Sequence, residues 1–332
     1  MTAASASAVR HGVLPVDKPS GPTSHDIVAQ ARRHFHTRSV GHAGTLDPMA
    51  SGVLVLLFGE ATKLSNVITL GDKRYRATFA FGCATDTHDA EGKPVLESEL
   101  PAHWLDERRL RAALSAEAER QQQLPPDVSA VKVAGKRAYR LHRQGIAPVL
   151  APRPVAVREL SLCAWSQTHV TLELNVSKGY YVRALARDLG AALGVPAHLA
   201  ELRRLASGGF HVHDACAWPP TSALSPIPLQ QALRGVLPLV RLTHSGVVRA
   251  RQGRVLCRED FLDDPERPLI CEPLAETPIV AWTDPDGLPI ALGESCDGKF
   301  LVRRGFSASL AEIGEPALPR MDQQFEVHDI ET

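Results

Sequence analysis

The sequence has few cysteines, and they form no recognisable pattern. Its six cysteines are scattered over 332 residues, without a C-x-x-C pair or a Cys/His cluster. Zinc sites need short, regular ligand spacings, and disulfide scaffolds are typical of much shorter secreted chains. We therefore expect reduced, buried thiols, no metal site and no disulfide framework.

Long hydrophobic runs are also absent. A membrane-spanning helix needs about 20 apolar residues, and no segment approaches that length. The N-terminal stretch MTAASASAVRHG has no apolar core of the kind found in secretory signals. A Walker or Rossmann glycine pattern is missing as well. These absences predict a cytoplasmic protein with no membrane partner.

The chain has no net charge, yet its charges are unevenly distributed. It carries 37 Lys+Arg and 37 Asp+Glu. Residues 259–332 hold 17 Asp+Glu against 5 Lys+Arg, which leaves 32 Lys+Arg and 20 Asp+Glu in residues 1–258. A basic body with an acidic end favours a nucleic-acid partner, although the need for solubility alone also produces such an arrangement.

Hydrophobic periodicity predicts strands and helices mixed without a regular βαβ repeat. This mixture indicates an α+β fold with a large mixed, mainly antiparallel sheet flanked by helices. In the helix at 182–193 we expect an apolar stripe that ends at Gly194. The expected strands are 13–17, 53–59, 73–82 and 168–176, and the expected helices are 25–36, 105–116 and 182–193.

Composition divides the chain into four segments. Residues 215–243 are rich in proline, include a predicted short helix near 228–234, and are typical of a linker. In the module that follows, we expect strands near 278–282, 288–293 and 300–303. The predicted segments are a flexible N-terminus at 1–12, a main domain at 13–243 that includes the linker, a compact β module at 244–306 and an acidic tail at 307–332.

One stretch, GHAGTLDPMASG at 41–52, places a single carboxylate among glycines and small residues. Its glycines permit backbone angles closed to other residues, and Pro48 biases Asp47 towards an extended conformation. Such a loop turns tightly and admits a bulky group against its backbone. An Asp-Pro turn or a helix cap is the ordinary interpretation of Asp47, so the rest of the sequence has to decide its role.

Motifs in a fixed order surround this loop. They are KRYR at 73–76, TDTHDAEG at 85–92 and SKGYYVRALARDLG at 177–190, with GEATK at 59–63, PP-x-x-SA-x-K at 125–132 and GKRAY at 135–139 between them. The ordered set closely resembles the TruB family of tRNA pseudouridine-55 synthases. The resemblance covers residues 13–212, and the β module resembles the family's C-terminal PUA-type RNA-binding domain more weakly.

The resemblance implies an isomerase that converts uridine to pseudouridine at position 55 in the T arm of tRNA. The reaction breaks the N1–C1′ bond, turns the base and joins C5 to C1′. It imports no group and changes no oxidation state overall, so we expect no cofactor. A carboxylate can act covalently in such chemistry, as in many glycosidases. Attack at C6, attack at C1′ and proton removal at C2′ remain equally open.

The family motifs assign roles to five residues. Asp47 is the expected catalytic aspartate, and Arg183 is its expected partner, which would keep the carboxylate ionised in a desolvated pocket. Tyr75 matches the tyrosine that stacks on the target base and takes part in proton transfer, and Tyr181 matches a second pocket tyrosine. His42 matches the histidine that fills the space left by the flipped nucleotide. Without the motifs, a surface arginine, core aromatics and a loop histidine would be the ordinary interpretations.

Other residues have less specific assignments. Leu202, in LRRL, is expected either to pack against the uracil or to be ordinary helix core, and Lys18 to contact a phosphate. For Asp86 and Asp89 we favour loop ordering over substrate contact. Val128 stands where the family often has an aromatic ring, which puts one packing contact in doubt. The candidates for RNA-backbone contact, with a solvated basic face as the equal alternative, are Lys132, Lys136, Arg137, Arg140 and Arg143.

The C-terminal module carries most of the negative charge, so only Arg303 and Arg304 are expected to form a contact patch there, and stability alone is an alternative reason for the module. We expect a monomer that needs no protein partner. Two further hypotheses stay open: a guide-RNA-dependent relative with the same catalytic residues, and an RNA-folding chaperone in which catalysis is secondary.

Overall fold

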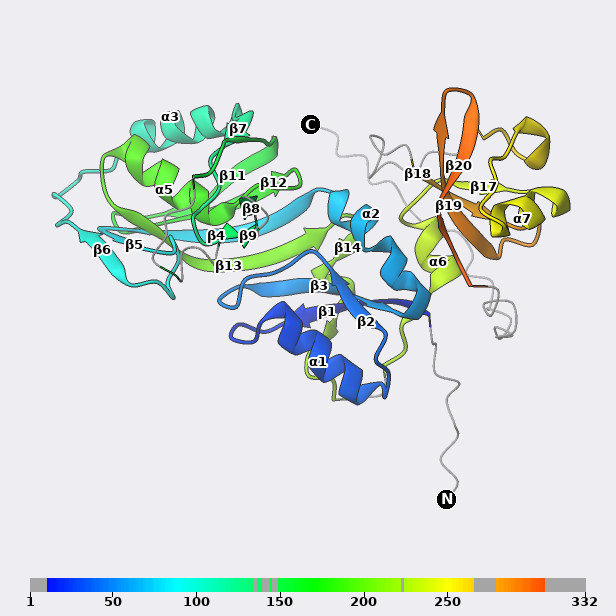
Figure 1. Cartoon of the computed structure of the whole chain (residues 1–332). Helices are drawn as coiled ribbons and strands as arrows, with labels where there is room; N and C mark the ends of the chain where they lie inside the picture. The colour runs from blue at the N-terminus through cyan, green and yellow to red at the C-terminus, as the bar shows by residue number, and fades with distance from the viewer. Residues whose placement is uncertain are drawn as a thin grey trace, which may run out of the picture.

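A ten-stranded mixed sheet forms the centre of the computed structural model, which describes residues 11–129, 131–133, 136–138, 144, 149–221, 224–265 and 279–307 (Figure 1). Its main path runs β11-β12-β4-β13-β3-β1-β15, with β2, β14 and β16 paired beside it. All pairs are antiparallel except β13 with β3 and β1 with β15. The predicted α+β fold with a mainly antiparallel sheet is confirmed. The strands are β1 (Gly12–Lys18), β2 (Val40–Ala43), β3 (Ser51–Phe58), β4 (Lys73–Phe81), β11 (Val157–Trp165), β12 (His169–Val176), β13 (Ala197–Ser207), β14 (Phe210–His211), β15 (Cys216–Ala217) and β16 (Ile227–Pro228).

Helices α5 (Val182–Leu193) and α3 (Glu107–Ala118) cover one face of the sheet half that contains β12, β4 and β13 (Figure 1). The predicted apolar stripe of α5 is buried: Val182, Leu185, Leu189 and Leu193 are at most 5% exposed. Gly194 ends the helix in the left-handed conformation, with φ of 74°. This packing fixes the start of α5, where Tyr181 and Arg183 lie.

The other half of the sheet is buried on both faces, as the unbroken apolar run at 53–59 predicts. Val53, Val55 and Leu57 of β3 enter one core, and alternate residues of the same strand enter another. Helix α1 (Ser24–His34) covers the second core, and Thr23 caps it through a capping box with Asp26. β3 is thereby a rigid base for the loop that precedes it.

Strand β13 corrects the sequence analysis, which considered helix core for Leu202. Ala197–Ser207 is an 11-residue strand between β4 and β3. Its Glu, Leu, Arg and Ala residues have helical propensities. Pairing with β4 along its length and with β3 near its end outweighs that local preference.

A second sheet, with order β17-β18-β19-β20, forms the C-terminal unit together with α7 (His244–Arg251). Its strands are β17 (Leu239–Arg241), β18 (Ile279–Thr283), β19 (Pro289–Cys296) and β20 (Lys299–Gly305). The three strands expected near 278–303 are present. Because β17 pairs with β18, this unit includes residues ahead of the predicted boundary at 244.

The two units share a hydrophobic core. Helices α2 (Ser65–Leu70) and α6 (Leu229–Arg234) pack with the C-terminal residues Ala281, Leu292 and Phe306. Lys63 of GEATK donates to the Gly305 carbonyl at 2.8 Å and lies over the Phe306 ring. Through Lys63, the GEATK motif therefore connects the end of β20 to the N-terminal unit.

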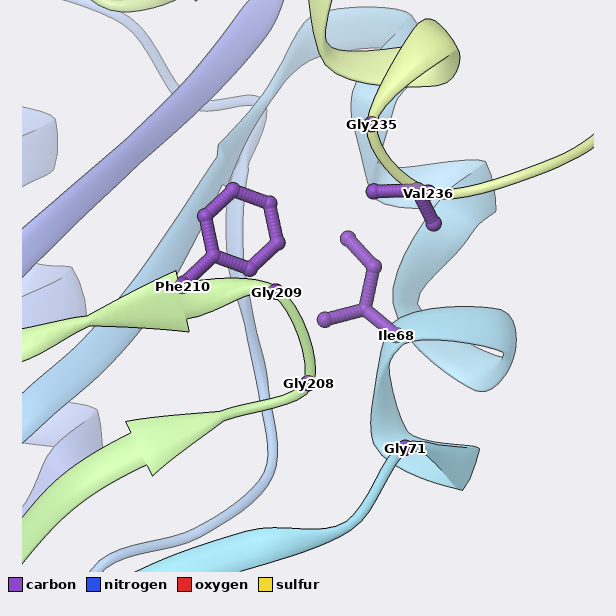
Figure 2. A pocket seen from close by; sticks show the side chains of 7 residues that line it. All are labelled: Ile68, Gly71, Gly208, Gly209, Phe210, Gly235 and Val236. Atoms are coloured by element: carbon purple, nitrogen blue, oxygen red, sulfur yellow. The ribbon is translucent and has the colours of Figure 1, made fainter. Parts of the chain in front are cut away.

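A small apolar pocket lies at this joint, between the end of α2, the β13–β14 hairpin and the end of α6 (Figure 2). None of the predicted site residues lines it. Its lining residues are Ile68, Gly71, Gly208, Gly209, Phe210, Gly235 and Val236.

The remaining short elements are η1 (Gly59–Leu64), β5 (Cys83–Thr85), β6 (Pro94–Glu97), β7 (Gln122–Gln123), β8 (Lys132–Val133), β9 (Lys136–Arg137), β10 (Arg153–Pro154), η2 (Val212–Asp214) and η3 (Arg258–Asp260). No helix in the described ranges is both long and apolar enough to cross a membrane.

Candidate active site

Asp47 lies in the tight loop that joins β2 to β3. Gly44 and Gly52 have φ of 87° and 107°, conformations that favour glycine. A Cβ at Gly52 would lie 2.2 Å from the Arg204 carbonyl oxygen of β13. Gly41 belongs to strand β2 and has no such angle, so only two of the three glycines are needed for the loop's turns.

The neighbours of Asp47 are anchored to β1 and α1. The Ser24 hydroxyl donates to the Leu46 carbonyl and accepts from the Leu46 amide, both at 2.9 Å. The Pro48 carbonyl accepts from the Gly21 amide at 2.8 Å and from the Lys18 ammonium at 3.2 Å. The backbone on both sides of Asp47 is fixed, while the Asp47 side chain remains 34% exposed.

Arg183 binds this exposed carboxylate from the buried side. Its Nε lies 2.9 Å from Asp47 Oδ2, and its side chain is only 9% exposed. A second carboxylate, that of Asp89, lies 3.5 Å from Nη1. The guanidinium also donates to the Thr87 carbonyl at 3.2 Å and to the Val128 carbonyl at 3.0 Å. Four acceptors therefore fix its orientation.

Asp89 is itself held in place and 5% exposed. Its carboxylate accepts from the Thr87 hydroxyl at 2.6 Å and from the Glu91 amide at 3.1 Å. Asp86 accepts from the Lys93 amide at 2.8 Å. Both contacts order the 85–93 loop, and Asp89 in addition links that loop to Arg183.

Two tyrosines stand near the ion pair. Tyr75 faces the apolar core from β4, and Tyr181 precedes α5 as its N-cap residue. Burial raises the pKa of both tyrosines, and the Asp47 charge adds a smaller contribution in the same direction. The Gln123 side chain holds the Tyr181 backbone, accepting from its amide at 2.8 Å and donating to its carbonyl at 3.1 Å.

His42 lies on β2 beside a second histidine. Its ring meets that of His25 edge to face, with centroids 5.3 Å apart. Burial, helped by His25 and Arg204, lowers the pKa of His42 to about 4. Its buried Nδ1 has no hydrogen-bond partner among the described residues. The imidazole is therefore neutral near pH 7 and presents a flat, uncharged ring.

The lowered pKa of His42 predicts an acid-sensitive contribution to stability. The unfolded chain binds a proton at His42 near pH 6.5, whereas the folded chain does so only near pH 4. Stability should therefore fall as pH drops from about 6.5 to 4. Thermal unfolding of the wild type and of His42→Phe across this pH range measures the effect. The Tm of the wild type should decrease more than the Tm of His42→Phe, and an equal decrease in both proteins would contradict the prediction.

The structure corrects the prediction for Lys18. Its side chain is fully buried, and its ammonium donates to the Pro19, Pro22 and Pro48 carbonyls at 2.8, 2.9 and 3.2 Å. These three bonds use all donors of a lysine, which leaves none for a phosphate. Lys18 instead supports the loop that carries Asp47.

The structure gives the positions of most of the remaining residues predicted to contact the substrate or the RNA. Leu202 is 7% exposed and packs in the core beside Tyr75. In the C-terminal unit, Arg303 is paired with Glu294 at 2.7 Å, so the predicted patch there keeps only Arg304. Of the basic run, Lys132, Lys136 and Arg137 form the β8–β9 hairpin, and Arg140 and Arg143 lie outside the described residues.

Comparisons with known proteins identify the family of this chain. Residues 32–182 match the N-terminal domain of TruB family pseudouridylate synthases, and residues 183–219 match the C-terminal domain of tRNA pseudouridylate synthase B. The tRNA pseudouridine synthase B of Mycobacteroides abscessus is 44% identical over 254 residues, which cover 74% of this chain and 85% of that protein. The chain belongs to the TruB family. It is a pseudouridine synthase, and hence an isomerase.

Other members of the TruB family are similarly close. The protein of Cutibacterium acnes is 44% identical over 75% of this chain and 86% of its own length. That of Mycobacterium avium is 49% identical over 61% of this chain and 67% of its own length. All three relatives carry the name tRNA pseudouridine synthase B.

Solved structures show the same fold. A chain of an H/ACA ribonucleoprotein bound to a substrate RNA containing 2′-deoxyuridine aligns with a TM-score of 0.63 and 22% identity, covering 90% of this chain and 86% of that one. A chain of a Cbf5–Nop10–Gar1 complex gives 0.62 and 24%, covering 92% and 82%. At identities this low, the similarity to these two structures shows a shared fold and nothing more.

Proposed function

We propose that this TruB-family enzyme isomerises uridine 55 in the T arm of tRNA, with Asp47 as its catalytic carboxylate. The ion pair between Asp47 and Arg183 carries the proposal. The guanidinium is buried and bound by four acceptors, whereas the carboxylate is a third exposed on its other side. An ionised carboxylate in this position is oriented towards an incoming nucleotide and is available for covalent or base chemistry.

The surrounding side chains suit a detached uracil. Tyr75 and Leu202, on neighbouring strands, provide an apolar surface for the base. Tyr181 adds a second ring near Asp47 and Arg183 from the start of α5, where Gln123 fixes its backbone. Water exclusion by these groups strengthens the electrostatic effect of Asp47 on the separating base and sugar.

Access to a stacked base requires extrusion from the RNA, at a cost of a few kcal/mol. We assign His42 to the space that the nucleotide leaves. Its neutral ring avoids a fixed charge inside the base stack and can stack on the flanking bases.

The C-terminal unit is assigned as a PUA-like RNA-binding domain that extends from β17 to Phe306. Arg251 in the last turn of α7, together with Arg304, gives it basic groups despite its acidic composition, whereas Arg249 in the same turn is paired with Asp260 at 3.7 Å. Because the substrate is tRNA, we place the enzyme in the cytoplasm, as a monomer that acts without a guide RNA or a protein partner.

A bare T-arm stem-loop with tritium at C5 of the target uridine tests the proposal. Forming the C5–C1′ bond displaces that hydrogen, so the purified enzyme should release tritium stoichiometrically. A stem-loop with cytidine at the target position and label in another loop uridine is the control and should release none. Release from the control would overturn the assignment of position 55. Absence of release from both this stem-loop and a complete unmodified tRNA would overturn stand-alone activity.

A further inference from the structure

Arg204 is an arginine buried almost completely beside the active site. It lies on β13 with 1% of its surface exposed. Its Nε donates to the Val53 carbonyl at 2.8 Å, its Nη1 to the Thr45 carbonyl at 3.1 Å and its Nη2 to the Gly44 carbonyl at 3.2 Å. One guanidinium thus ties the start of the loop that carries Asp47 to strand β3, which follows the loop.

The burial of this charge is costly. A buried guanidinium loses its hydration, and an ion pair is the usual compensation. No carboxylate in the described ranges forms an ion pair with Arg204, whose hydrogen-bond partners there are backbone carbonyls. An aliphatic side chain would fill a core position at lower cost, so the geometry of the donors explains the arginine better than packing does.

The same guanidinium faces Tyr75. Arg204 and Tyr75 stand directly opposite each other in the antiparallel pair of β13 and β4, which places both side chains on one face of the sheet. Burial raises the pKa of Tyr75, and the charge of Arg204 acts in the opposite direction. The cation therefore acts on the Tyr75 hydroxyl across the strand pair.

We propose that Arg204 is a positioning residue that sets the Asp47 loop and the Tyr75 hydroxyl relative to each other. This inference rests on the proposed function of Asp47 and Tyr75. By holding the Gly44 and Thr45 carbonyls, Arg204 fixes the height of the loop above the sheet. Through its charge, directly opposite Tyr75 in the strand pair, it sets the electrostatic environment of the Tyr75 hydroxyl beside the site that the uracil would occupy.

Arg204→Lys and Arg204→Gln test the proposal, with Arg203→Lys as the matched control. Arg203 precedes Arg204 on the same strand but pairs with Asp17 at 2.7 Å, and it reaches only the Ser51 hydroxyl at the start of β3, at 3.3 Å, rather than the loop carbonyls. Both Arg204 variants lose the forked donors. A misplacement of about 1 Å can cost about 100-fold in rate, so we expect kcat for tritium release to fall about 10- to 100-fold. The Kd for the stem-loop should stay within about twofold, as lost preorganisation affects turnover rather than RNA contact.

A double-mutant cycle with Tyr75→Phe tests the link to the hydroxyl. If Arg204 acts partly through Tyr75, Arg204→Lys should reduce kcat less in the Tyr75→Phe protein than in the wild type. An equal reduction in both backgrounds would overturn this link. Loss of RNA affinity in step with kcat, or failure of both Arg204 variants to fold while Arg203→Lys folds, would overturn the positioning role as a whole. A wild type without tritium release would instead indicate failure of the proposed function.

Discussion

Asp47→Asn is expected to abolish turnover while leaving RNA binding intact. The amide has the size and shape of the carboxylate, so the loop held by Ser24, Lys18 and Arg204 should keep its course. It carries no negative charge and is neither a nucleophile nor a base, and loss of such a group typically costs about 100- to 10,000-fold or more. Tritium release from the T-arm stem-loop should fall to background, and the Kd should change by less than about threefold.

Glu173→Gln provides the control for this experiment. Glu173 is also a carboxylate in an ion pair with an arginine, Arg76 at 2.6 Å, but it lies on β12 on the polar face of the sheet. The same change of charge there should leave turnover at the wild-type value. Residual turnover above about a tenth of wild type in Asp47→Asn would contradict a catalytic carboxylate at this position.

Arg183→Met should reduce turnover much more than RNA affinity. The unbranched methionine fills part of the buried volume but leaves Asp47 and the almost fully buried Asp89 without the cation between them. Breaking a buried pair leaves an uncompensated charge, and the two carboxylates then repel each other. We expect kcat to fall about 100-fold or more, because the carboxylate loses the preorganised charge that orients it.

Arg183→Lys separates charge from geometry in this effect. A lysine restores the positive charge but cannot reproduce the planar contacts to Asp47, Asp89 and two carbonyls. It should recover part of kcat and most of the folding stability. Single-turnover rates and stem-loop Kd values measure the outcome, and equal losses of turnover and affinity in Arg183→Met would count against this role.

The parts of this fold that follow a local pattern were predictable from sequence. The stripe of α5, the apolar run of β3 and the alternation of β4 each determine their element within about ten residues. The site at Asp47 and Arg183 was predictable only through the ordered motifs, because the two residues are far apart in sequence. No periodicity places them in contact.

Features that depend on long-range contacts escaped the sequence analysis. β13 carries helix-forming residues and becomes a strand because β4 and β3 pair with it. Lys18 looked like an RNA contact, yet proline carbonyls surround its ammonium. Gln123 and Arg204 gave no local signal, although QQQLPP and LRRL contain them, because their partners, Tyr181 and the Asp47 loop, are distant in sequence.

The shared core between the two units has a consequence for how the chain can be divided. Phe306, Leu292 and Ala281 complete a core to which β1, β2, β3, η1, α2 and α6 also contribute residues. Glu60 accepts from the Ser307 amide at 2.7 Å, and Lys63 donates to the Gly305 carbonyl. A chain that ends before Leu239 would therefore lack part of that core and would expose its remaining apolar side chains to water. The C-terminal unit is therefore an integral part of the folded enzyme and not a separable accessory domain.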